Sequence, residues 1–172
     1  MAHASIDTPS PWVVRWAPLV ERGPVLDVAS GAGRHAKVFL RRNLPVVAVD
    51  RDAQSIPGAR FVQADLEDGG PWPFAGERFG AIVVTNYLHR PLLPILKEAL
   101  AEGGVLIYET FMAGNERYGR PSNPNFLLRP GELLAAFGDL TVVAFEQGDT
   151  GKAALQRICV IRAEASSVRI PA

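Results

Sequence analysis

Apolar residues gather in short runs that alternate with amphipathic stretches along most of the chain. Runs such as Ala81-Ile82-Val83-Val84 contain no polar position, which is typical of strands covered on both faces. We expect strands at residues 25–30, 46–50, 60–64, 79–85, 104–110, 140–147 and 154–162. We expect helices at residues 11–22, 34–43, 91–101 and 131–137, with a weak turn at 52–56.

The order of these elements predicts the fold class. Strands that alternate with helices favour an α/β fold with a doubly wound, mostly parallel sheet of seven strands. The last two strands are separated only by residues 148–152, which is too short for a parallel crossover, so they should form an antiparallel hairpin. The chain shows no internal repeat. We therefore expect a single domain over residues 1–172, with an ordered core at 11–164.

The interval from Met112 to Pro130 follows neither pattern. It contains three prolines, two glycines and three asparagines, and neither a strand nor a regular helix fits it well. A loop of this length in a compact domain is usually functional or disordered. Tyr118 and Phe126-Leu127-Leu128 offer apolar area for docking, which argues against disorder. We interpret residues 112–130 as an ordered flap over a substrate site, and the alternative is a peripheral loop.

Composition and charge argue against several classes of protein. A chain of 172 residues buries roughly 70% of its unfolded surface, which supports one core. The 18 basic and 18 acidic residues balance, so no global field favours nucleic acid or an acidic membrane. The single cysteine, Cys159, lies in an apolar strand and is expected in the core, which fits a reducing compartment. No run reaches the ~18 apolar residues of a membrane span, and no signal-peptide pattern is present. These features predict a cytoplasmic protein without a metal site.

A glycine-rich turn, Gly31-Ala32-Gly33, follows the first buried strand and opens a helix. Asp50 ends the next strand, about 20 residues later. Glycines allow the backbone to approach a ligand closely, and a carboxylate at this spacing can bind the hydroxyls of a ribose. The pattern predicts a site for an adenosine-containing cofactor. A nicotinamide dinucleotide is disfavoured, because Asp27 lies within the first strand, Asp65 closes the third, and no second domain remains to hold a hydride acceptor.

At these residues the chain resembles the class I S-adenosylmethionine-dependent methyltransferases, over about residues 11–164. The segment Asp27-Val28-Ala29-Ser30-Gly31-Ala32-Gly33 is similar to their first motif, D-x-G-x-G-x-G, with Ala29 in place of the first glycine. Their fold is a Rossmann-like sheet with a terminal reversed hairpin. The compact size is similar to the small bacterial, tellurite-resistance-type members. The resemblance implies that S-adenosylmethionine is the cofactor and that a methyl group is transferred.

The resemblance also implies a role for each matching residue. Gly31 and Gly33 would pass close to the methionine part of the cofactor, with Asp27 near its ammonium group. Asp50 would bind the ribose, and Asp65 would meet the adenine amino group. The complete set of implied cofactor contacts is Asp27, Ala29, Gly31, Gly33, Arg34, Asp50, Arg51, Asp65, Leu66 and Asn86. For Arg34 and the adjacent His35, the alternative is that both side chains point into solvent.

Candidate catalytic residues come from the loops after the fourth and fifth strands, because ligands of such sheets lie beyond the carboxyl ends of the strands. These candidates are His89, Glu109 and Tyr87. Methyl transfer is an in-line displacement that depends on holding the nucleophile in position, and a base is needed only for a protonated nucleophile. His89 could be that base, or it could cap the helix near Pro91. Glu109 could have a pKa raised by burial, or it could pair with a flap arginine.

The acceptor is less specified by the sequence than the cofactor. The candidate acceptor-binding residues are Arg90, Arg117, Tyr118 and Arg120. Guanidinium groups around an acceptor favour a carboxylate, a phosphate or another oxyanion. One alternative is a set of solvated charges with one or two salt bridges. Another is that Tyr118 and Phe126 wall an aromatic or apolar acceptor. Trp12 and Trp16 share one helical face, which predicts packing on the sheet. The resemblance implies, as an alternative, that one of them forms part of a lid over the cofactor.

The expected function is therefore S-adenosylmethionine-dependent methyl transfer to a small acceptor, with an anionic one favoured. The expected partner is that small molecule, with the protein a monomer or a homodimer and neither a membrane nor a nucleic acid as partner. Three alternatives stay open. They are an RNA or protein methyltransferase, a non-catalytic domain that binds the cofactor, and a nicotinamide enzyme.

Overall fold

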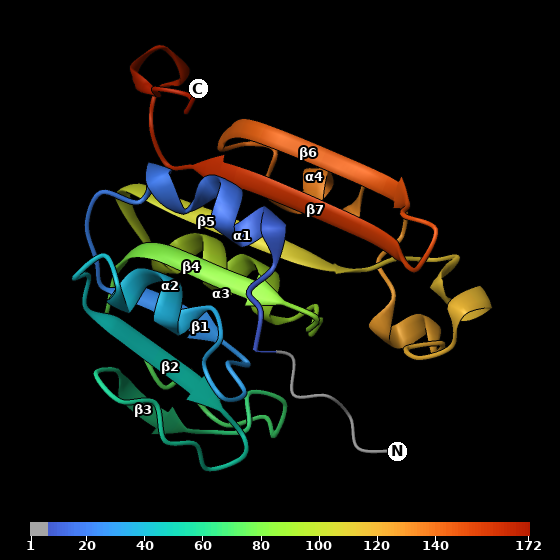
Figure 1. The fold of residues 1–172 in the computed structure, drawn as a ribbon, viewed down its shortest axis with the longest axis horizontal. Coiled ribbons are helices and arrows are strands. Elements are labelled where there is room, and N and C mark those ends of the chain that lie inside the picture. Colours follow the sequence, from blue (N-terminus) through green and yellow to red (C-terminus); the bar gives the residue numbers. More distant parts are fainter. Residues whose placement is uncertain (1–6) are drawn as a thin grey trace.

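The computed structural model describes residues 7–172, which form one seven-stranded sheet in the order β3-β2-β1-β4-β5-β7-β6 (Figure 1). The strands are β1 (Val25–Val28), β2 (Val46–Asp50), β3 (Arg60–Gln63), β4 (Phe79–Thr85), β5 (Leu100–Phe111), β6 (Thr141–Asp149) and β7 (Ala154–Ile161). Strands β1 to β5 are parallel, whereas β7 is antiparallel to both β5 and β6. The predicted fold class and the reversed hairpin are thus confirmed. Within residues 7–172, every helix is too short or too polar to cross a membrane.

Helices cover both faces of the sheet, with α1 and α2 on the near face in Figure 1 and α3 and α4 on the far face. The helices are α1 (Pro11–Trp16), α2 (Ala36–Leu40), α3 (Leu92–Ala99) and α4 (Glu132–Phe137), and short 3₁₀ helices lie at Ala17–Leu19, Asn115–Tyr118, Pro124–Phe126 and Ala165–Ser167. The helix predicted at 11–22 ends at Trp16, because Pro18 has no N–H to donate to the preceding turn, and the chain continues as a short 3₁₀ helix over Ala17–Leu19.

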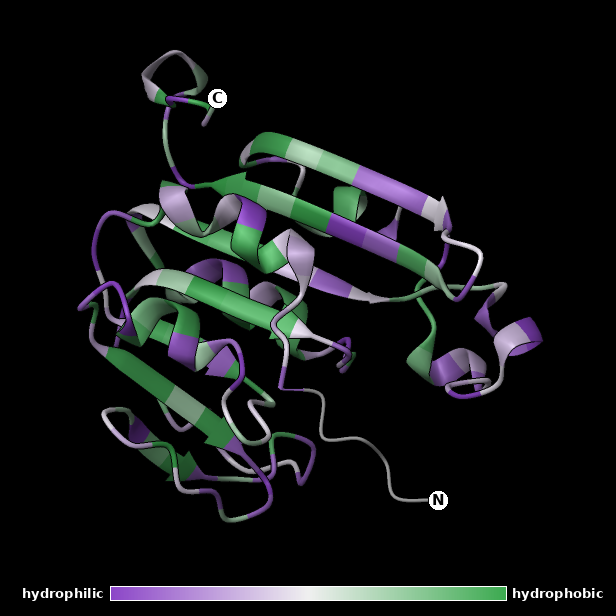
Figure 2. Cartoon of the chain, in the orientation of Figure 1, coloured by the Kyte–Doolittle hydropathy of each residue, from purple (hydrophilic) through white to green (hydrophobic). Residues whose placement is uncertain are grey.

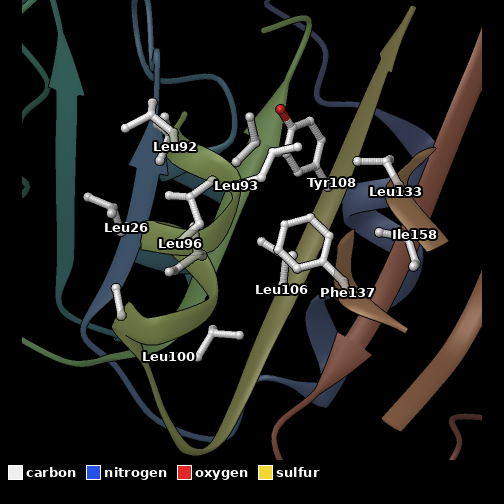
Figure 3. Packing of buried hydrophobic residues seen from close by; sticks show 14 of the residues in the cluster. Leu26, Leu92, Leu93, Leu96, Leu100, Leu106, Tyr108, Leu133, Phe137 and Ile158 are labelled. Atoms are coloured by element: carbon white, nitrogen blue, oxygen red, sulfur yellow. The ribbon is translucent and has the colours of Figure 1, made fainter. Parts of the chain in front are cut away.

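Two apolar clusters, one on each face, hold the layers together. Figure 3 shows the far cluster, in which α3 and α4 pack against the middle of the sheet. Its labelled members are Leu26, Leu92, Leu93, Leu96, Leu100, Leu106, Tyr108, Leu133, Phe137 and Ile158. The near cluster joins α1 and α2 to the opposite side chains of β1, β2 and β4. Because the central strands are buried on both faces, the uninterrupted apolar runs in the sequence are explained.

The parallel register brings the functional loops together. Val25 of β1 lies opposite Val46 of β2 and Ala81 of β4, so the carboxyl ends of these strands share one edge. Figure 2 shows hydrophobic strands in the middle of the sheet and hydrophilic segments after their carboxyl ends. The flap, residues 112–130, continues from β5 at that same edge (Figure 1).

The two ends of the flap pack against each other and onto the core. Leu128 is fully buried and its N–H donates to the carbonyl of Phe111, while Ala113 N–H donates back to the carbonyl of Leu128. Phe126, by contrast, is half exposed. The segment contains two 3₁₀ turns rather than a strand or a regular helix, as its composition suggests.

The ordered core begins before the predicted boundary at residue 11. Ser10 is buried, and its hydroxyl accepts a hydrogen bond from the N–H of Trp12 at the start of α1. This N-cap is worth about 1 kcal/mol. The prediction that the ordered core begins at residue 11 is therefore wrong for Ser10, and residues 1–6 lie outside the described part of the chain.

Candidate functional site

The turn after β1 has left-handed backbone at three positions. Ala29 has φ 53°, Gly31 φ 51° and Gly33 φ 82°. A Cβ on Gly33 would approach Ile56 to 2.7 Å, whereas a Cβ on Gly31 would meet nothing within 4 Å. Glycine is thus favoured at position 33 both by the positive φ and by the lack of space for a Cβ, and at position 31 by the positive φ alone. The free space beside Gly31 leaves its backbone accessible to a ligand.

Asp50 ties this turn to the end of β2. Its Oδ2 accepts the N–H of Gly31 at 2.8 Å, and its Oδ1 accepts the N–H of Asp52 at 2.9 Å. Each carboxylate oxygen has two lone pairs, so Asp50 keeps capacity for a ligand. Asp65, at the end of β3, accepts the N–H of Glu67 in the same way.

A cavity of about 510 Å³ lies between these strand ends. Its lining residues are Ala29, Val49, Asp50, Arg51, Ala64, Asp65, Leu66, Glu67, Tyr87 and Phe126. Its volume is within the range of small-molecule sites, and its apolar walls carry a few convergent polar groups. Five of the predicted cofactor contacts therefore meet in one cavity: Ala29, Asp50, Arg51, Asp65 and Leu66. We call it the β2–β3 cavity.

Asp27 is buried on the side of the sheet that α2 covers. Its Oδ2 accepts the N–H of Ala36 at 3.0 Å, at the start of α2. Burial raises the pKa of Asp27 to about 8, although the Ala36 hydrogen bond and the positive charge of Arg34 act against this shift. Asp27 does not line the β2–β3 cavity, and its observed contact is structural.

His35 is buried, so the interpretation that its side chain points into solvent is wrong. Its Nε2 accepts the N–H of Ser10 at 3.0 Å, and its Nδ1 lies 3.2 Å from Oγ1 of Thr85. Burial, together with the charge of Arg34, lowers the pKa of His35 to about 4. A neutral ring that accepts at Nε2 must carry its proton on Nδ1 and donate it to Thr85. Arg34 itself donates to the carbonyl of Thr8 at 2.9 Å, so both residues hold the N-terminal segment.

A second cavity, of about 330 Å³, lies beneath the flap, and we call it the flap cavity. Its lining residues are Glu67, Asn86, Tyr87, Leu88, Thr110, Phe111, Pro121 and Phe126. Asn86 has φ 54° and its N–H donates to the carbonyl of Glu109, which fixes the loop after β4 against β5. The buried hydroxyl of Tyr108 donates to the carbonyl of Tyr87 at 2.8 Å and fixes the next residue.

The two cavities share a wall made of Glu67, Tyr87 and Phe126. The Tyr87 hydroxyl lies 3.4 Å from one carboxylate oxygen of Glu67, and Nδ1 of His89 lies 3.4 Å from the other. Burial and the neighbouring charge of Glu67 raise the pKa of Tyr87, so its hydroxyl remains protonated and can donate. His89 lines neither cavity. Sequence reasoning missed Glu67, although its place two residues after Asp65 was an available signal.

Glu109 lies on the face of β5 that α1 covers, whereas the next residue, Thr110, faces the flap cavity. Its carboxylate accepts the Ser10 hydroxyl at 2.6 Å and pairs with Arg157 at 2.9 Å. The expected pairing with a flap arginine is thus wrong, because the partner comes from β7. Strand alternation explains this result, since successive side chains point to opposite faces.

Arg90 holds the flap rather than facing the flap cavity. Its guanidinium forms a two-point ion pair with Glu132 of α4, at 2.6 and 3.1 Å. It also donates to the carbonyls of Asn125 and Leu127 within the flap. All three nitrogens of the guanidinium thus have partners within the protein, and Arg90 lines neither the β2–β3 cavity nor the flap cavity, so these contacts do not support the prediction that it binds an acceptor.

The other predicted acceptor contacts lie at the outer end of the flap. Arg117 pairs with Asp149 at 3.1 Å, and the Tyr118 hydroxyl donates to the same carboxylate at 2.6 Å. Arg120 is exposed and forms neither an ion pair nor a hydrogen bond with residues 7–172. None of these three lines the flap cavity. The structure thus favours the alternative of solvated and paired charges over a cage around the acceptor.

The tryptophans of α1 pack on the sheet as expected. Trp12 and Trp16 are buried, contact each other edge to face, and line neither cavity. Trp12 also donates to the carbonyl of Ile158 in β7. Cys159 is buried in the core as predicted, and burial raises its pKa to about 12. Residues 7–172 contain no cluster of ligating side chains that could hold a metal ion.

Comparison with known proteins finds one matching family model and several solved structures of similar fold. Residues 26–107 match the model of a family described as a methyltransferase domain. Among curated proteins, no sequence matches the chain significantly. TehB from Haemophilus influenzae has a similar structure, with a TM-score of 0.70 and 16% identity, over 90% of this chain and 62% of that one. The chain thus spans less than two thirds of the length of TehB.

Two further solved structures cover this chain to a similar extent. One is a 1,6-didemethyltoxoflavin-N1-methyltransferase from Burkholderia thailandensis with bound S-adenosylhomocysteine, with a TM-score of 0.61 and 18% identity, over 89% of this chain and 76% of that one. The other is the N-methyltransferase NodS from Bradyrhizobium japonicum, with a TM-score of 0.58 and 15% identity, over 88% and 91%. At these identities the likeness concerns the fold.

Proposed function

We propose that the chain, which matches a methyltransferase domain over residues 26–107, is a class I S-adenosylmethionine-dependent methyltransferase that transfers a methyl group to a small molecule held in the flap cavity. The Burkholderia neighbour acts on a small molecule according to its name, and this chain offers a cavity of matching scale. When bound, S-adenosylmethionine supplies a methyl carbon activated by a positively charged sulfur.

The β2–β3 cavity fits the adenosine part of this cofactor. The carboxylate of Asp50 has free lone pairs for the ribose hydroxyls, and Asp65 lies at the end of the next strand for the adenine amino group. Val49 and Leu66 supply apolar walls for the base. The open backbone beside Gly31 would receive the methionine part.

The observation that carries the proposal is the wall shared by the β2–β3 cavity and the flap cavity. A methyl transferase must hold two ligands side by side, because the displacement is in line and short-ranged. Holding the reacting groups together contributes about 7–11 kcal/mol to lowering the barrier. Glu67, Tyr87 and Phe126 would then lie where the two ligands meet.

The geometry revises the predicted catalytic set. Tyr87 faces both cavities with a protonated hydroxyl, so it would position a ligand as a donor. His89 would act through Glu67, whose carboxylate lies 3.4 Å from its Nδ1. Glu109 would support the N-terminal segment through Ser10 rather than act as a base. Asn86 was predicted as a cofactor contact, but it lines the flap cavity and not the β2–β3 cavity, so it would face the acceptor.

Binding of the cofactor tests the proposal. S-adenosylmethionine or S-adenosylhomocysteine at 100 times its dissociation constant adds about 2.7 kcal/mol, which should raise the melting midpoint by about 5–10 °C. NAD should cause no shift. A shift with NAD and none with S-adenosylhomocysteine would overturn the proposal.

Asp50 provides a matched variant for this test. Asp50→Asn removes the charge that would bind the ribose hydroxyls, so we expect calorimetry to show about tenfold weaker binding of S-adenosylhomocysteine. Asp68→Asn is the control, because Asp68 lies in the loop after β3 and lines neither cavity. Equal affinities for the two variants would contradict the assignment of Asp50.

A further inference from the structure

The flap cavity has aromatic walls. Tyr87 closes it from the loop after β4, Phe111 from the end of β5, and Phe126 from the flap. Pro121 adds a rigid apolar surface on the flap side. A cavity of about 330 Å³ with such walls suits a flat ring system of one or two rings.

The polar groups of the flap cavity are acidic or neutral. Glu67 contributes a carboxylate, while Asn86 and Thr110 contribute an amide and a hydroxyl. Within residues 7–172, no lysine or arginine lines this cavity. An anionic acceptor would therefore meet a negative charge and the negative faces of aromatic rings without a compensating cation.

Glu67 is free to accept from a ligand. Its side chain is 43% exposed, and its contacts with the Tyr87 hydroxyl and with His89 are both long, at 3.4 Å. Its backbone, in contrast, is fixed by the hydrogen bond from its N–H to Asp65. The carboxylate thus stands at the junction of the two cavities with a held main chain and unused lone pairs.

Building on the proposed function, we propose that the acceptor is a planar aromatic or heteroaromatic amine and that Glu67 binds its N–H group. The amine nitrogen attacks the methyl carbon with its lone pair, the carbon–sulfur bond breaks, and the electron pair of that bond stays on sulfur as S-adenosylhomocysteine forms. The proton leaves the nitrogen to Glu67 and passes to solvent, so charge and atoms balance.

This chemistry agrees with the electrostatics of the flap cavity. During transfer to a neutral nitrogen, positive charge moves from the sulfur onto the acceptor. A carboxylate and aromatic faces stabilise that developing charge. His89, on the other side of Glu67, lies on a path by which the proton can leave. The same carboxylate and aromatic faces would not stabilise an anionic nucleophile.

Paired probes with the same ring test the acceptor class. Naphthylamine is compared with naphthoate, and aminobenzimidazole with benzimidazole carboxylate, each titrated by calorimetry into the protein saturated with S-adenosylhomocysteine. We expect each amine to bind at least about tenfold more tightly than its carboxylate partner. Methyl transfer from labelled S-adenosylmethionine should follow the same order. Failure of both amines to bind, or preference for the carboxylates, would overturn the inference.

Variants of Glu67 test whether this carboxylate binds the N–H group of the acceptor. E67Q should weaken amine binding by about tenfold and remove the preference for amines, whereas the control E98Q, on α3 and outside both cavities, should change neither. E67K should reverse the preference towards the carboxylates, a gain that misfolding cannot produce. An unchanged preference in E67Q and E67K would contradict the role of Glu67.

Titration of S-adenosylhomocysteine alone separates this inference from the proposed function. If the wild-type protein does not bind it, the proposed function fails. If all variants bind it and the amines are still not preferred, only the inference on the acceptor fails.

Discussion

Ala29 has a backbone conformation that is unfavourable for alanine. It stands where the first motif of the family has glycine, and its φ of 53° lies in the left-handed region. This conformation costs an L-residue about 1–2 kcal/mol, while glycine loses about 0.5–1 kcal/mol through the entropy of the unfolded chain. We therefore expect Ala29→Gly to raise the free energy of unfolding by about 0.5–1 kcal/mol, measured by urea denaturation.

Ala32 in the same turn is the matched control for Ala29. Its φ is not positive, so Ala32→Gly brings the entropic cost alone and should lower the free energy of unfolding by about 0.5–1 kcal/mol. If both substitutions were destabilising to the same extent, strain at Ala29 would be refuted.

At the scale of elements, one side chain connects the flap to α4. Arg90 connects α4, through Glu132, to the flap carbonyls of Asn125 and Leu127. Lysine cannot reproduce this fork of donors. We expect Arg90→Lys to increase amide hydrogen exchange across residues 112–130 by about tenfold while the central strands keep their protection, because the base of the flap loses its anchor.

A remote ion pair provides the control for the flap. Arg60, at the start of the edge strand β3, donates to both carboxylate oxygens of Glu77, and neither residue lines the two cavities. Arg60→Lys should leave exchange in residues 112–130 unchanged. Equal exchange in the flap of Arg90→Lys and of the wild type would show that apolar docking through Leu128 is sufficient.

At the scale of the whole molecule, local patterns in the sequence predicted the sheet and several of the residues that line the β2–β3 cavity. Buried strands leave continuous apolar runs, and the glycine turn followed by Asp50 has a fixed spacing, so both can be found within short windows. The contacts of Glu109 could not be found in that way. Its partner Ser10 is 99 residues away, and Arg157 is 48 residues away. Contacts between residues so far apart leave no periodic pattern in a short window of the sequence.

The same limitation applies to the acceptor. A count of arginines near the flap favoured an anion, but the structure turns Arg90 towards Glu132 and Arg117 towards Asp149. Glu67, which lines both cavities, belongs to a stretch of the chain without regular structure. Which charges face a cavity is decided by tertiary packing, and side-chain identity alone does not contain that information.

Two buried titratable groups give the fold opposite pH dependences. The pKa of His35 is lowered to about 4, so its neutral form stabilises the fold above pH 6.5, and that contribution is lost as pH falls towards 4. We expect His35→Gln to remove this loss while keeping a hydrogen-bonding side chain next to Ser10 and Thr85. Urea midpoints at pH 5 and 7 measure it, and an equal decline in both proteins on acidification would contradict it.

Asp27 acts in the other direction. Its pKa is raised from 3.8 to about 8, so the folded protein holds a proton that the unfolded chain has released over most of this range. Because the unfolded state then binds fewer protons, the free energy of unfolding falls as pH rises from about 4 to about 8. Asp27→Asn keeps an oxygen to accept from Ala36 N–H and removes the titration. The variant should therefore resemble the wild type near pH 4 and exceed its stability increasingly towards pH 8, in urea titrations without ligand. Arg34 and Asp50 affect the Asp27 carboxyl in opposite senses and are the same in both proteins. A stability difference that stays constant between pH 4 and pH 8 would mean that Asp27 is ionised in the folded state, held by the start of α2.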